Sequence, residues 1–207
     1  MLFDEPSKLS TKVILDWHAT CSKGLDRERK EAYSSLTGGV ALPAYLLDAL
    51  LASTKSEIDE YYECCVQELD ISTVLILIAS AEARIRLDAL NRKDNCNSPI
   101  AGRLKLLFAH PPKSWQVSLY EDGIMDAWKD YFGQILPVTD RNRLVSSIGS
   151  FKSMLQVRHW VAHGRYWEPK HQIKAYPPVT VAKLINSLYS ALHEVTIVSD
   201  IRQFESN

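Results

Sequence analysis

Apolar residues recur at helical spacing along almost the whole chain, and we find no run with the sustained alternation of a half-buried strand. The strongest segment is predicted to be a helix from Asp70 to about Arg92, capped by Asp70 or Ser72. Its inward positions are Val74, Leu75, Ile78, Ala81, Ile85 and Leu90. Because this segment is apolar nearly all round at its start, we expect it to be the central helix.

Other helices follow from the same spacing and from the Pro, Gly and Asn residues that mark turns. Ser7 or Ser10 is predicted to cap a first helix that runs through about Cys21 and ends at Gly24. Thr139 or Asp140 is predicted to cap a second long helix, which continues to Gly164. The remaining predicted helical segments are 25–36, 43–51, 56–69, 101–110, 124–134 and about 181–195.

This pattern predicts an all-α fold, an up-and-down bundle of four to five main helices with short accessory helices. The length of 207 residues fits one domain with its own core. We therefore expect a single helical domain over 1–207, with 1–52 as an N-terminal helical extension packed on a core bundle of 53–207.

Composition and charge narrow the classes of function. With 46% hydrophobic residues and a formal net charge of -1, the chain has no global attraction for nucleic acid, so any site for a polyanion must be a local patch. The four cysteines have no zinc-site spacing, which favours reduced thiols in a cytoplasmic protein. The acidic start of the chain does not resemble a signal peptide, and the apolar run Val74–Ala83 is too short to span a bilayer. We accordingly expect no membrane contact.

Candidate chemistry is concentrated where an arginine precedes a histidine by a short interval. With eleven arginines and six histidines, about one such match with four to six intervening residues is expected by chance, and the chain has three. The pairs are Arg103 with His110, Arg165 with His171, and Arg158 with His163. The first runs into a Pro-Pro stop and the second crosses a proline in a polar loop. Only Arg158 and His163 lie on the last turns of a long packed helix that can fix side-chain directions.

The residue types suit chemistry on a phosphodiester. A guanidinium is a permanent cation whose planar fork fits a phosphate, and imidazole exchanges protons near neutral pH. A break at Gly164 would leave both groups at an accessible edge of the bundle.

The stretch RHWVAHGRY, residues 158–166, resembles the signature of the HEPN superfamily, in the form R-H-x-x-A-H-G. The clear match covers about a dozen residues. Ribonuclease members of that superfamily have the arginine and the histidine near the end of a helix in a small helical bundle. The resemblance implies a metal-independent endoribonuclease without a cofactor, in which His163 is the general base or acid and Arg158 stabilises the charged transition state. It also implies RNA as the substrate, because the 2′-hydroxyl is the nucleophile.

The resemblance further implies a homodimer, since HEPN nucleases commonly place two motifs in one composite cleft. The setting it suggests is stress, a toxin-antitoxin system or phage defence, with a neutralising protein partner as one option. The alternatives from other classes are a non-catalytic HEPN-like module that binds RNA, nucleotide or a protein, and a helical interaction protein whose motif is coincidental.

Several neighbours are candidate supporting residues. Glu82 interrupts an apolar helix and would hold the fork of Arg158, or else pair with Arg86 or reach solvent. His159 is four residues from His163, the spacing of a metal-binding pair, but we interpret it as supporting the site or contacting RNA, or as a polar residue on the helix face, and expect no metal. Arg165 and Tyr166 are candidates for binding phosphate and stacking on a base, with a loop position and core packing as the alternatives.

Overall fold

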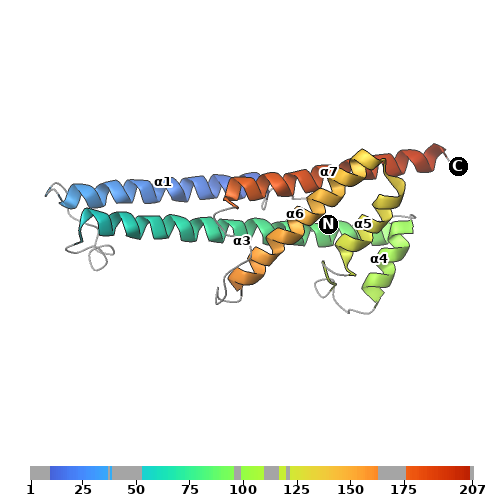
Figure 1. Cartoon of the computed structure of the whole chain (residues 1–207), viewed down its shortest axis with the longest axis horizontal. Coiled ribbons are helices and arrows are strands. Elements are labelled where there is room, and N and C mark those ends of the chain that lie inside the picture. The colour runs from blue at the N-terminus through green and yellow to red at the C-terminus, as the bar shows by residue number, and fades with distance from the viewer. Residues whose placement is uncertain are drawn as a thin grey trace. The chain divides into compact units, whose positions relative to one another are not determined.

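The computed structural model describes residues 10–36, 38, 53–95, 99–109, 117–119, 122–162 and 176–205, and only the backbone at 95, 99 and 193–205. Within these ranges the chain forms helices and no strand, which confirms the expected all-α bundle. Figure 1 labels the helices: α1 (Thr11–Leu36), α3 (Lys55–Asn95), α4 (Pro99–Ala109), α5 (Ile124–Ile135), α6 (Val138–Ala162) and α7 (Pro178–Glu205). The predicted segment 43–51 lies outside the described residues.

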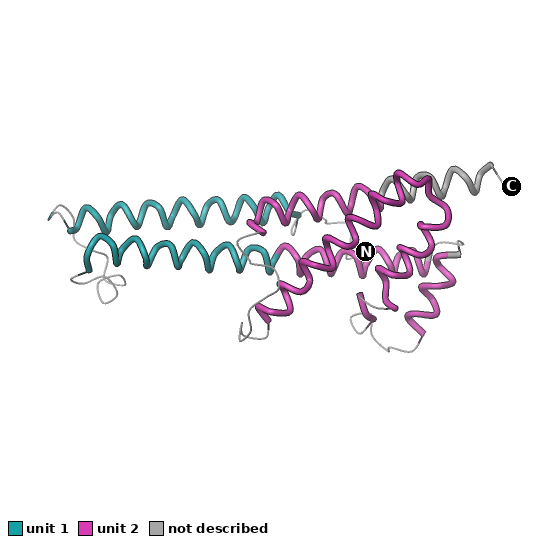
Figure 2. Tube along the Cα trace, in the orientation of Figure 1, with its two compact units in different colours: residues 1–76 teal, residues 77–207 magenta. Residues whose placement is uncertain are grey.

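The chain divides into two compact units, residues 1–76 and 77–207 (Figure 2). The boundary between the two units falls inside α3, between Ile76 and Leu77. The predicted N-terminal extension over 1–52 stays a prediction. That the whole chain acts as one domain stays a prediction.

The first unit is a helical hairpin of α1 with the N-terminal half of α3. His18 Nε2 lies 2.6 Å from Asp70 Oδ1, and the Tyr33 hydroxyl donates to Asp59. Because the start of α1 meets the later part of this half and the end of α1 meets its beginning, the two helices are antiparallel. Buried Ala32, Ile58 and Tyr62 form the core of the hairpin, with Leu25 and Tyr33 packed against them.

Two predicted breaks are wrong, because α1 continues through Gly24 and α3 is one helix of 41 residues. A glycine inside a helix costs about 1 kcal/mol relative to alanine, which packing easily offsets. The residues after Gly24 are held by Leu25, which packs against the hairpin core, and by the i,i+4 pair of Lys30 with Asp26, at 2.6 Å. Asp70 is not a cap, since its carboxylate faces His18 from the middle of α3.

The helix starts have identifiable caps. The Ser10 hydroxyl accepts a bond from the Val13 N–H at 3.3 Å, so Ser10 caps α1. The other predicted cap, Ser7, lies outside the described residues. Thr54 and Glu57 form a reciprocal capping box at the start of α3, with the Thr54 N–H donating to Glu57 Oε2 at 2.6 Å. Helix α6 begins at Val138, before both predicted caps, Thr139 and Asp140, and the Pro137 carbonyl accepts its first bond.

The second unit packs α4, α5, α6 and α7 with the C-terminal half of α3. The most extensive packing joins α6 to α7, and α5 contacts both α4 and α6. Its core consists of fully buried apolar residues from all five helices, among them Leu77, Ile78, Ile85, Leu104, Trp128, Phe132, Leu144, Phe151, Met154, Ile185 and Leu188.

One property of α3 bears on the question of membranes. Among the described helices, α3 is long and apolar enough to cross a membrane by length and composition, with a mean hydropathy of 1.6 over its most apolar window. The apolar run Val74–Ala83 is only a part of this longer helix, so the short length of the run does not exclude that α3 spans a membrane. A core helix of a water-soluble protein passes the same test, so the expected cytoplasmic location and absence of membrane contact stay predictions.

Candidate functional site

Arg158 lies in the last turns of α6, on a stretch whose other side chains are anchored. Met154, Leu155 and Val157 are fully or almost fully buried, so the backbone that carries Arg158 is fixed by packing. The Arg158 side chain itself is 42% exposed. The guanidinium is thus accessible to a ligand while its attachment point is held in the core.

Glu82 of α3 faces this guanidinium. Arg158 Nε lies 3.3 Å from Glu82 Oε2, and only 16% of the Glu82 side chain is exposed. The Oε2 atom accepts no aligned hydrogen bond from the described residues, so the contact is an attraction of charges without a well-directed bond. Such a contact orients the arginine but leaves its fork free to turn toward an anion.

The other carboxylate oxygen of Glu82, Oε1, accepts hydrogen bonds from Arg86. Arg86 Nη2 donates to Glu82 Oε1 at 3.0 Å, and Arg86 Nε approaches the same oxygen at 3.4 Å. Arg86 Nη1 also donates to the Val117 carbonyl. The two partners that the sequence left open for Glu82, Arg158 and Arg86, therefore both contact it. Among the described residues, one carboxylate thus contacts two guanidinium groups.

The other motif residues are not all described. His163, Arg165 and Tyr166 lie outside the described residues, so the structure does not relate them to Arg158, and their roles stay predictions. His159 lies on the exposed side of α6 and interacts with a neighbouring group. Within the described ranges, no three His, Cys, Asp or Glu side chains are placed to hold a metal ion, and the expectation of a metal-free site stays a prediction.

The competing arginine of the spacing analysis has a different environment. Arg103 Nη2 donates to Asp130 Oδ2 at 2.7 Å, and both side chains are about half exposed. Its histidine, His110, lies outside the described residues. Arg103 therefore provides a natural comparison for Arg158, as an ion-paired arginine on another helix of the same unit.

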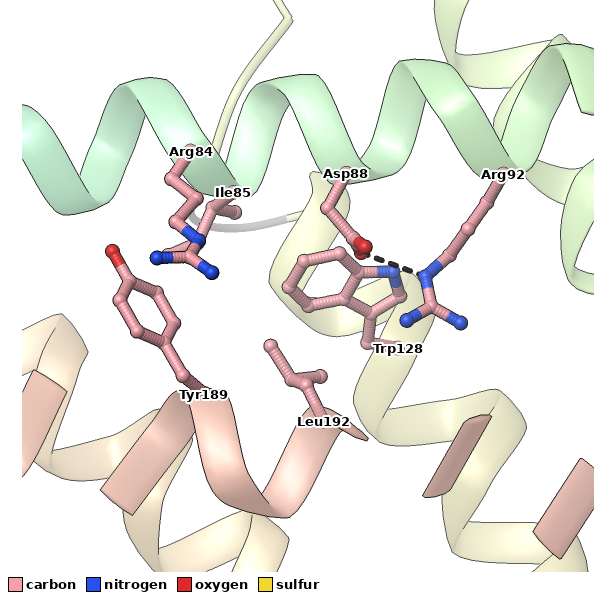
Figure 3. A pocket seen from close by; sticks show the side chains of 7 residues that line it. All are labelled: Arg84, Ile85, Asp88, Arg92, Trp128, Tyr189 and Leu192. Carbon is pink, nitrogen blue, oxygen red and sulfur yellow. Dashed lines mark hydrogen bonds and ion pairs between the residues drawn. The ribbon is translucent and has the colours of Figure 1, made fainter. Parts of the chain in front are cut away.

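A feature that the sequence reasoning missed is a cavity of about 230 Å³ between α3, α5 and α7. The described residues that line it are Arg84, Ile85, Asp88, Arg92, Trp128, Tyr189 and Leu192 (Figure 3). The i,i+4,i+8 spacing of Arg84, Asp88 and Arg92 on α3 is a sequence signal for one charged face. Nothing in the sequence joins that face to Trp128 or to α7.

Electrostatics at this cavity are set by α3. Arg92 Nε donates to Asp88 Oδ2 at 2.6 Å, and the Arg84 guanidinium lies 4.5 Å from the centre of the Tyr189 ring. Burial raises the pKa of Tyr189 to about 12, although the nearby Arg84 charge acts in the opposite direction. The phenol is therefore neutral at physiological pH and does not cancel the arginine charges.

No protein-family model matches the chain, and no curated protein and no solved structure is similar to it.

Proposed function

We propose that this protein is a metal-independent endoribonuclease of the HEPN type, with Arg158 and His163 as its catalytic residues. The observation that carries the proposal is the state of Arg158. Its side chain is 42% exposed at the end of a packed helix, and its guanidinium faces Glu82, which Arg86 holds from the other side. This is the environment expected of a cation that must receive a phosphate in a defined place.

The chemistry needs only these two kinds of group. The ribose 2′-oxygen attacks the adjacent phosphorus, the bond to the 5′-oxygen breaks, and a 2′,3′-cyclic phosphate remains. His163 exchanges the proton, taking it from the 2′-hydroxyl or giving it to the leaving oxygen. Arg158 stabilises the extra negative charge that builds on the phosphoryl oxygens, a contribution that commonly amounts to about 10²–10³ in rate for one such group.

The proposal includes the partners that the resemblance implies. The substrate is RNA, because DNA lacks the 2′-hydroxyl nucleophile. Two copies of the chain form a homodimer so that both motifs line one cleft. Arg165 and Tyr166 contact the RNA, Glu82 and His159 support the catalytic pair, and a stress, toxin-antitoxin or phage-defence setting would require a neutralising partner.

Cleavage of total RNA in EDTA tests the proposal. We expect the wild type to cleave and to leave cyclic phosphate ends, and Arg158→Ala and His163→Ala each to lower the rate by about 10² or more. Arg103→Ala is the matched control, since it removes another half-exposed, ion-paired arginine. It should retain wild-type activity.

Two results would overturn the proposal in different ways. Cleavage that disappears only when EDTA is added would assign the chemistry to a metal held by His159 and His163. An inactive wild type that still binds RNA, nucleotide or a protein would establish the non-catalytic module instead. A protein that stays monomeric at micromolar concentration in analytical ultracentrifugation would contradict the composite cleft.

A further inference from the structure

The charges of the chain are divided unequally between its two compact units. Residues 1–76 contain 7 Lys and Arg against 13 Asp and Glu, a formal net charge of -6. Residues 77–207 contain 17 Lys and Arg against 12 Asp and Glu, a formal net charge of +5. The near-neutral total of -1 therefore conceals one acidic unit, residues 1–76, and one basic unit, residues 77–207.

Salt makes the charge of each unit matter more than the charge of the whole chain. The Debye length is about 8 Å at physiological ionic strength. Helix α1 has 26 residues and is therefore about 39 Å long at 1.5 Å per residue, so a charge at one of its ends is screened long before the other end. A polyanion consequently responds to the charges of the unit that it touches.

The basic unit presents lysines to the solvent on three of its helices. Lys105 on α4, Lys129 on α5 and Lys183 on α7 are all exposed. A lysine carries a point charge on a flexible stem, which suits contact with phosphates whose positions are not fixed. Arg158, the arginine that is proposed to act on a phosphodiester, belongs to the same unit. The cations that attract a nucleic acid and the group that would act on it therefore share one unit.

We propose that RNA is attracted to the basic unit and held there through exposed lysines, and that the acidic unit takes no part in RNA binding. The proposal rests on the ribonuclease function for the identity of the polyanion, but it makes a separate claim about where that polyanion binds. Because each phosphate that a lysine neutralises releases counterions from the nucleic acid, the affinity falls with salt in proportion to the number of such contacts.

Fluorescence anisotropy of the full chain with a labelled 2′-O-methyl oligouridine tests this location. The probe has the phosphates and ribose rings of RNA but no free 2′-hydroxyl, so it cannot be cleaved by the proposed chemistry. We expect the wild type to bind it, with an association constant whose logarithm falls linearly with the logarithm of the salt concentration between about 50 and 200 mM.

Two triple variants with the same change of net charge locate the binding. The first removes three exposed cations of the basic unit, and the second removes three exposed cations of α1: Lys105→Gln, Lys129→Gln and Lys183→Gln against Lys12→Gln, Lys23→Gln and Arg27→Gln. Glutamine has nearly the helix propensity of lysine and arginine, so both variants should remain folded, which circular dichroism verifies.

The first triple variant should reduce the slope of the salt dependence by about 0.7–2, which corresponds to one to three phosphate contacts on a single strand. At 50 mM salt this loss weakens binding by roughly tenfold or more. The second triple variant should bind the probe with the slope and the affinity of the wild type, because the cations that it lacks belong to the acidic unit.

Four results would overturn the proposal. The first is a wild type that does not bind the probe at about 50 mM salt. Equal weakening by the two triple variants would show that the net charge of the whole chain governs binding, and greater weakening by the second would place the RNA on the acidic unit. Binding to phosphatidylcholine vesicles that contain phosphatidylserine, without binding to the probe, would assign the basic unit to a membrane surface.

The ribonuclease proposal stands or fails separately from these results. A protein without nuclease activity can bind the probe through its basic unit, because the probe is not cleaved. An active ribonuclease whose affinity depends on the α1 cations would keep its proposed chemistry and contradict only the location of the RNA.

Discussion

Replacing Glu82 with glutamine distinguishes how strongly each of its two arginine partners, Arg86 and Arg158, depends on the carboxylate charge. Glutamine has nearly the same shape but no charge. Arg86 is only 15% exposed and directs both Nη2 and Nε at Glu82 Oε1, whereas Arg158 is 42% exposed and contacts Oε2 without an aligned hydrogen bond. The same substitution should therefore affect Arg86 strongly and Arg158 weakly.

The expected free energies follow from those environments. A hydrogen bond to a charged group contributes about 1.5–3 kcal/mol, and an exposed ion pair about 0–1 kcal/mol. We expect a coupling of about 2 kcal/mol between Glu82 and Arg86, and of less than about 1 kcal/mol between Glu82 and Arg158. For a domain of about 150–250 residues, 1 kcal/mol shifts Tm by about 2–4 °C, so Glu82→Gln should lower Tm by about 4–8 °C.

Double-mutant cycles measure both couplings. The set is Glu82→Gln, Arg86→Met, Arg158→Met and the two double variants with Glu82→Gln, each unfolded in urea. Circular dichroism and tryptophan fluorescence must give coincident transitions, because the chain has two compact units and the free energy of unfolding is defined only for a two-state change.

A larger coupling of Glu82 to Arg158 than to Arg86 would refute this reasoning. The expected order has a consequence for the enzyme assay. If Arg158→Met costs less than about 1 kcal/mol of stability, the variant remains folded and a loss of RNA cleavage reports on chemistry. Arg86→Met is then the control for damage to stability.

Three further predictions concern single positions. Gly24→Ala should stabilise the chain by about 0.5–1 kcal/mol in urea unfolding, because Gly24 lies inside a helix and a Cβ there meets nothing within 4 Å. The Tyr189 pKa of about 12 is above the unfolded value, so its contribution to stability is complete below pH of about 10 and is lost as pH rises through 12; an ultraviolet titration of Tyr189→Phe against wild type should lack this late tyrosinate step. The Thr54 N–H and hydroxyl lower the pKa of Glu57, so its contribution to stability is present above the ordinary value of 4.5 and is lost as the pH falls through the lowered pKa. Thr54→Ala removes the hydroxyl bond but keeps the N–H, so it should remove part of the loss of helical circular dichroism that wild type shows as the pH falls below 4.5.

Much of the helical architecture was predictable because the apolar spacing records which face is buried. The segments 101–110 and 124–134 agree with α4 and α5 within about two residues, and the last helix begins at Pro178, about three residues before the predicted start near 181. The errors are the two interruptions at Gly24 and Asp70. Both residues favour a helix end when only their neighbours in sequence are considered. The contacts that keep the helices continuous join α1 to α3, residues far apart in the sequence, and local helix propensity does not include them.

The candidate site was predictable in part for a similar reason. Glu82 was recognisable because a carboxylate within an apolar helix needs a partner, and both candidate partners contact it. The cavity residues Trp128 and Tyr189 were not recognisable, because they come from α5 and α7 and only the packing of the unit brings them to α3. The geometry of His163 relative to Arg158 stays a prediction.

The contrast between Arg158 and Arg103 shows what the structure adds to a motif that spacing could not distinguish. Both arginines contact a carboxylate, so an ion pair alone does not separate them. Asp130 is 50% exposed and has no second partner in the described structure, and its rotation frees Arg103 at little cost. Glu82 is 16% exposed and is held by Arg86, so the charge that orients Arg158 is itself fixed. A fixed counter-charge gives Arg158 a constant electrostatic environment that Arg103 lacks, and this favours Arg158 as the functional arginine.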